Sequence, residues 1–169
     1  MSDLELCYLP ATEAIAQFKA KTLSPVELLD ALIKRAEEVE PVINAFTYRH
    51  FDEAMDKAKK AEAKYASGKR TRALEGLPIG IKDENLIKGK PTSSGSLIMK
   101  DFVADRTSVG NERILRAGGI VHARTATPEF SSAGYTNSRL WGVTRNPWNP
   151  EFTPGGSSGG TAASLAAGT

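Results

Sequence analysis

The residues best suited to chemistry lie in a glycine-rich segment, GGSSGG at 155–160, near the end of the chain. Four glycines around two serines allow tight turns with positive φ, so hydroxyl and backbone N–H groups can converge on one point. A flexible linker has the same composition. A phosphate-binding loop needs the G-x-x-x-x-G-K-[ST] pattern, which is absent. A G-x-S-x-G nucleophile elbow needs a later histidine, whereas His50 and His122 both precede the segment. The segment alone therefore leaves a catalytic and a structural role equally open.

A second candidate is Lys82, which ends the apolar run Leu77-Pro78-Ile79-Gly80-Ile81. A lysine in this position is most often a surface residue. The alternative is a buried lysine that is kept neutral to act as a base, because burial disfavours a charged amine by up to roughly 3–5 pKa units. A fold tolerates that cost for chemistry, so a buried lysine here would mark a catalytic site.

The rest of the chain must position these two segments, and its pattern is typical of an α/β protein. Ser24-Pro25-Val26-Glu27 combines an N-cap hydroxyl, a proline at the first helical position and a capping-box glutamate, and Pro41 is expected to end the helix that follows. Helices are expected at 11–19, 25–40, 52–66, 109–117 and 161–167, strands at 77–81 and 120–124, a strand or connector at 44–49, and an extended segment at 85–87. The long loop at 125–160 is rich in Gly, Pro, Ser, Thr and Asn, which favours a functional role.

Four stretches carry a resemblance to the amidase signature family, and they occur in the family's order. They are GLPIGIKDENLIKGKPTSSGS, RILRAGGIVHARTATPEFSSAG, GVTRNPWNP and PGGSSGGTAASLAAGT. The resemblance covers almost the whole chain. The resemblance implies amide hydrolysis by a Ser–cisSer–Lys triad. It makes Lys82 the neutral base and Ser157 the bridging serine, held by a cis peptide bond, that relays a proton between Lys82 and the nucleophile. The family's nucleophilic serine lies beyond Thr169, so this chain alone is expected to be inactive.

The resemblance also suggests residues around this pair. Ser131 is a candidate for the wall of the acyl pocket, although a capped turn explains it as well. Asp83 and Ser158 are expected to brace Lys82 and Ser157 by hydrogen bonds. Asp83 could instead form a plain ion pair that keeps Lys82 charged. Gly155 and Gly156 are expected to shape the substrate side of the loop.

The implied fold is α/β, an amidase-signature mixed sheet flanked by helices, of which this chain supplies the N-terminal portion. We expect a helical region at 1–67 and the first part of the signature core at 68–169. An incomplete sheet would expose an edge and apolar surface. The expected partners are therefore a C-terminal remainder of the same protein or a second copy of the chain, together with a small-molecule amide substrate.

Bulk properties exclude several other classes of function. The net charge is +2, from 22 basic and 20 acidic residues that are spread along the chain, which does not favour nucleic acid. No signal peptide or membrane span is visible, and the lone Cys7 fits a cytoplasmic setting. His50 and His122 are isolated, so neither a metal nor another cofactor is implied.

Two alternatives to a stand-alone amidase remain open. The first is the glutaminase-type A subunit of a tRNA-dependent amidotransferase, whose activity would rise with its partner subunits. The second is a non-catalytic binding module, in which replacement of Lys82 by alanine would cost no function.

Overall fold

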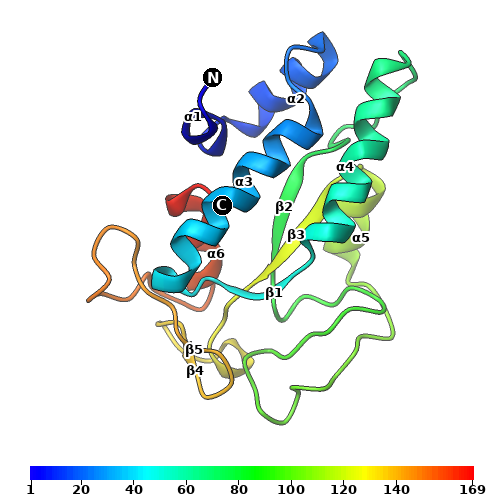
Figure 1. The fold of residues 1–169 in the computed structure, drawn as a ribbon. Coiled ribbons are helices and arrows are strands. Elements are labelled where there is room, and N and C mark those ends of the chain that lie inside the picture. The colour runs from blue at the N-terminus through cyan, green and yellow to red at the C-terminus, as the bar shows by residue number, and fades with distance from the viewer.

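The computed structural model describes residues 1–169, and the helices surround a small central sheet (Figure 1). The helices are α1 (Asp3–Cys7), α2 (Ala11–Ala20), α3 (Pro25–Ile43), α4 (Phe51–Ala66), α5 (Val109–Arg116) and α6 (Gly159–Ala167), with a 3-10 turn η1 (Glu129–Ser131). The strands are β1 (Phe46–Arg49), β2 (Pro78–Lys82), β3 (Ile120–Thr125), β4 (Asn137–Ser138) and β5 (Gly142–Val143). None of the helices has the length and apolar character needed to cross a membrane.

The central sheet has the order β1-β3-β2 and is mixed, because β3 pairs antiparallel with β1 and parallel with β2. This confirms the expected α/β class with a mixed sheet. The neighbouring residues Ile120 and Val121 of β3 point to opposite faces. Ile120 packs with Leu29 of α3 and with alanines of α4, whereas Val121 packs with Ile81 and residues of α5. Helices therefore cover both faces, and β1 and β2 are the edges of this three-stranded sheet.

Helix α3 begins as the sequence predicts but ends later. Ser24 and Glu27 form the reciprocal capping box, with Pro25 at the first helical position. The prediction that Pro41 ends the helix is wrong, since the helix continues through Ile43. A proline so close to the end removes only one helical hydrogen bond. The buried Glu40 carboxylate then accepts from the N–H groups of the two residues that follow the left-handed Asn44, which closes the turn into β1.

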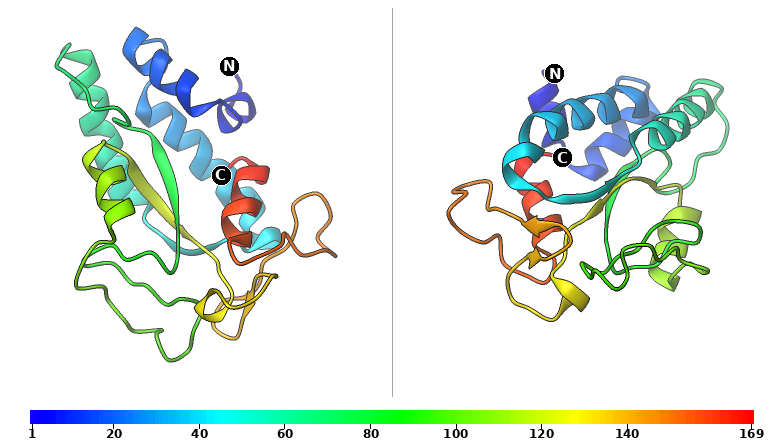
Figure 2. Two further views of the ribbon diagram at one scale, coloured as in Figure 1. Left: turned by 180° about the vertical axis from the view of Figure 1, so that it is seen from behind. Right: turned by 60° about the horizontal axis from the view of Figure 1, so that its bottom comes forward.

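Long loops, which often carry functional residues, lie where the parallel strands β2 and β3 end (Figure 2). The carboxyl edge of parallel strands is where α/β proteins usually place their ligand sites. Strand β2 is half-buried rather than fully buried along most of its length. The segment 85–87, predicted to be extended, lies instead in and just after the turn that follows β2.

Helix α6 packs against the end of β3 through small residues. Ala163 and Ala167 share a buried cluster with Ala36 of α3 and Ala123 of β3. At the start of the helix, the backbone N–H of Gly160 donates to the carbonyl of Ala126 at 3.1 Å. The glycine-rich segment is thereby fixed against the sheet, next to the end of β2.

His122 is a buried residue of β3 that should make folding sensitive to pH. Its ring packs on Phe46 and Phe51, and neither ring nitrogen has a hydrogen-bond partner. Burial lowers the pKa of His122 from its usual 6.5 to about 4. Between these two pKa values, His122 is protonated in the unfolded chain and neutral in the folded chain. We expect this group to lower the free energy of unfolding by roughly 3 kcal/mol as the pH falls from 6.5 to 4, measured by urea unfolding.

A His122→Phe variant provides the control for this pH dependence. Phenylalanine keeps an aromatic ring among Phe46 and Phe51 but cannot be protonated. The difference in unfolding free energy between the variant and the parent chain should therefore change between pH 6.5 and pH 4 in favour of the variant. Parallel curves for the two proteins over that range would contradict the assignment.

Candidate active site

Lys82 and Ser157 come from segments 75 residues apart and meet at the carboxyl end of β2. The Lys82 amine donates to Ser157 Oγ at 2.7 Å. The Lys82 side chain is only 10% exposed, which makes it a largely buried lysine. The peptide bond between Gly156 and Ser157 is cis. The structure thus brings together the two residues that the sequence singled out for chemistry.

The loop that carries Ser157 packs closely against Tyr135 and Thr136. A Cβ added to Gly156 would lie 2.6 Å from the N of Tyr135, so only glycine fits at this position. Thr136 Oγ1 donates to the carbonyl of Gly155 at 2.9 Å and accepts from the N–H of Gly159 at 3.0 Å. Ser158 is exposed and its side chain makes no hydrogen bond, so the bracing contact expected of it is absent.

The ion partner of Lys82 is Glu84, which the sequence analysis did not single out. Glu84 Oε1 lies 3.2 Å from the Lys82 amine. Its other carboxylate oxygen accepts a hydrogen bond from Ser131, the residue predicted for the acyl pocket. Ser131 also bonds to Thr127 Oγ1 at 2.8 Å. Ser131 therefore belongs to the same cluster as Lys82, linked through a carboxylate.

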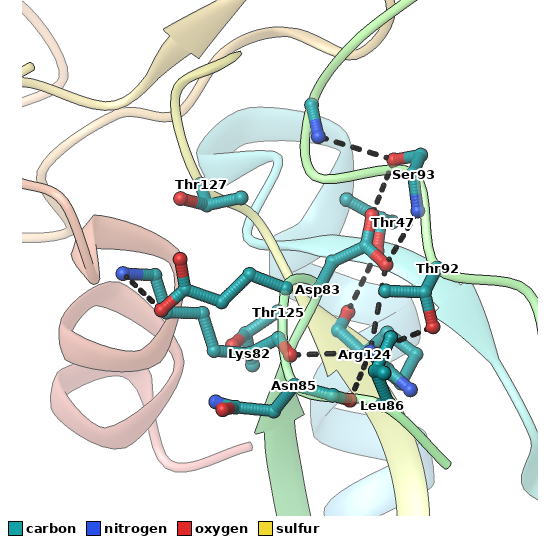
Figure 3. A network of polar contacts seen from close by, with 12 residues as sticks. Thr47, Lys82, Asp83, Asn85, Leu86, Thr92, Ser93, Arg124, Thr125 and Thr127 are labelled. Carbon is teal, nitrogen blue, oxygen red and sulfur yellow. Dashed lines mark hydrogen bonds and ion pairs between the residues drawn. The ribbon is translucent and has the colours of Figure 1, made fainter. Parts of the chain in front are cut away.

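Asp83 faces away from this cluster and makes no hydrogen bond or ion pair with Lys82 or Ser157, contrary to the expectation. Successive residues at a strand end point to opposite sides, which separates it from Lys82. Figure 3 shows the Lys82 side chain directed towards α6, with Asp83, Ser93 and Arg124 on the other side. Asp83 accepts from the N–H of Ser93 at 3.1 Å and from its hydroxyl, and lies 3.6 Å from Arg124 Nη2. Burial raises the pKa of Asp83, opposed by these same partners.

Arg124 fixes the backbone that presents Lys82. Its side chain is fully buried, and Nη2 donates to the carbonyls of Lys82 at 3.2 Å and of Asn85 at 2.8 Å. An arginine within the predicted strand 120–124 was the available sequence signal, because an arginine is rarely buried without a partner. Arg124 and Asp83 thus form a buried pair that holds the turn after β2 in place.

The sequence profile of the Amidase family matches residues 27–169, most of the chain. The chain belongs to the amidase family. It is 39% identical over 153 residues to the A subunit of the glutamyl-tRNA(Gln) amidotransferase from Synechococcus sp. (strain CC9605), covering 90% of this chain and 31% of that protein. The chain spans about a third of the length of such relatives.

Solved amidase structures share the same arrangement. A bacterial aryl acylamidase of the amidase signature family aligns with a TM-score of 0.87 and 31% identity, over 92% of this chain and 33% of that one. 6-Aminohexanoate cyclic dimer hydrolase aligns with a TM-score of 0.84 and 31% identity, over 96% and 32%. The expected amidase-signature fold is confirmed over the portion that this chain covers.

Proposed function

We propose that the protein hydrolyses amides, with Lys82 as the base and Ser157 as the proton relay of an amidase triad. The observation that carries this proposal is the 2.7 Å contact between the Lys82 amine and Ser157 Oγ, which joins two separate family motifs. An uncharged Lys82 would take a proton from Ser157 while Ser157 takes one from the family's nucleophilic serine. The same pair would then return the proton to the leaving amine, so that protons balance over each half-reaction.

The test uses a protein that carries these residues together with the rest of the family's length. Replacement of Ser157 by alanine removes the only hydroxyl bonded to the Lys82 amine. We expect kcat/KM for a simple aryl amide to fall by about 10²–10⁴-fold, the usual contribution of general acid–base catalysis. The control is Ser67→Ala, since Ser67 is exposed at the end of α4 and bonds only within its own turn. Equal losses in both variants, or none in Ser157→Ala, would contradict the proposal.

A second candidate function is the glutaminase reaction of an amidotransferase A subunit. It is favoured by relatives from several bacteria, at 36–39% identity, whose names describe them as the A subunit of glutamyl-tRNA(Gln) amidotransferase. Glutamine hydrolysis that rises on addition of the other amidotransferase subunits would support it. Turnover of aryl amides without any partner would support a stand-alone amidase. A cytoplasmic setting, expected from the lone Cys7, belongs to either version of the proposal.

A further inference from the structure

Glu84 occupies a central position in the site, although it was not among the residues predicted from the sequence to act there. It follows β2 by two residues, and its carboxylate lies between the Lys82 amine and the Ser131 hydroxyl. The Lys82 amine therefore has two partners, Ser157 on one side and Glu84 on the other. The four side chains form a continuous line from the serine loop to the turn at η1.

The contact between Ser131 and Glu84 helps to hold a turn with an uncommon backbone conformation. Phe130 and Ser131 both have positive φ, 48° and 56°. Two consecutive non-glycine residues in the left-handed region are uncommon, and they persist only where surrounding contacts impose them. The hydrogen bond from Ser131 to Glu84 is one such contact, and that from the N–H of Phe130 to the carbonyl of Ser94 is another. Glu84 thus ties the strained turn to the lysine.

The contact between Glu84 and the Lys82 amine favours the charged forms of both groups. Burial raises the pKa of Glu84, but the hydrogen bonds from Ser131 and Lys82 outweigh that effect and lower it below its ordinary 4.5. Glu84 is therefore an anion at neutral pH. An anion in contact with an amine favours the charged form of the amine. A charged ammonium donates hydrogen bonds but cannot accept a proton from Ser157.

We propose that Glu84 is a positioning residue that holds the Lys82 amine on Ser157 and keeps it charged in the resting site. This inference deepens the proposed function and rests on it for its catalytic meaning. For Lys82 to act as a base, its proton must first leave or the carboxylate must be drawn away. Glu84 would then set the pH at which the site becomes active, and Ser131 would orient Glu84 for this task.

The test follows the Lys82 side chain by NMR in the 169-residue chain labelled with ¹³C-lysine. The Lys82 Hε–Cε signal is assigned by its loss in Lys82→Arg. In Glu84→Gln, the midpoint of its alkaline titration should move to lower pH, because the variant lacks the anion 3.2 Å from the Lys82 amine. Glu84→Asp should retain part of that effect. An unchanged midpoint in a folded Glu84→Gln chain would overturn the proposal.

A measurement on the unmodified chain covers the case in which the variant does not fold. The Lys82 signal should shift a second time below pH 4.5, as Glu84 becomes protonated, and absence of that step would equally overturn the proposal.

Glu53→Gln is the matched control, because it removes a carboxylate that pairs with Lys57 and Lys90 instead. The Lys82 midpoint should not move in that variant. Neither titration needs turnover, so failure of amide hydrolysis and failure of this inference would be seen separately.

Discussion

Replacement of Lys82 by methionine is expected to lower kcat/KM for amide hydrolysis by about 10³-fold or more, in a protein that carries the full family length. Methionine preserves most of the buried aliphatic stem but cannot exchange a proton with Ser157. Because the lysine would act in both half-reactions, acylation and deacylation should slow together. The measurement is steady-state hydrolysis of an aryl amide, with single-turnover kinetics to separate the two steps.

Lys90→Met is the matched control for this prediction. Lys90 is also a partly buried lysine paired with a glutamate, since its side chain is 28% exposed and contacts Glu53. It lies outside the Lys82–Ser157 cluster and should leave kcat/KM within a few-fold of the parent value. Retained kcat/KM in Lys82→Met would contradict the assignment of Lys82 as the base, because methionine cannot exchange a proton with Ser157.

Local signals in the sequence predicted most of the helices and strands. The capping box at Ser24 and Glu27, the apolar run before Lys82 and the helix before Gly118 each specify structure within a few residues. Ser2 and Glu5 carry the same capping-box signal and could have predicted α1 as well. The error at Pro41 had a different origin, because the continuation of α3 depends on Glu40, whose carboxylate reaches the next segment of chain.

In the candidate site, too, some features could be predicted from the sequence and others could not. Lys82 and Ser157 could be paired from the sequence only through the family resemblance, since no spacing rule brings together residues 75 positions apart. Their contact depends on parallel pairing of β2 with β3 and on the seat of α6 against β3. The roles of Asp83 and Glu84 could not be separated from the sequence. Which of two neighbouring carboxylates faces the lysine depends on the direction in which β2 ends, and the structure assigns Glu84 to Lys82 and Asp83 to Arg124.

Gly160→Ala is expected to destabilise the protein strongly, because Gly160 lies where α6 packs most closely on the backbone that follows β3. A Cβ at this position would lie 2.2 Å from the N of Ala126, 2.6 Å from its carbonyl oxygen and 2.7 Å from that of Ala45, all backbone atoms that cannot turn aside. The helix must therefore move away from β3 and lose its hydrogen bond to Ala126. We expect the free energy of unfolding to fall by at least about 3 kcal/mol, measured by urea unfolding.

Gly110→Ala separates this steric effect from helix propensity. Gly110 lies in α5, and a Cβ there would meet nothing within 4 Å. Alanine should stabilise that helix by about 0.5–1 kcal/mol, so the same substitution has opposite signs at the two sites. Because Ser157 precedes Gly160 by three residues, a displaced α6 would also carry Ser157 away from the Lys82 amine. A Gly160→Ala chain with unaltered stability would mean that α6 does not need this close approach, and the position of Ser157 would then require another cause.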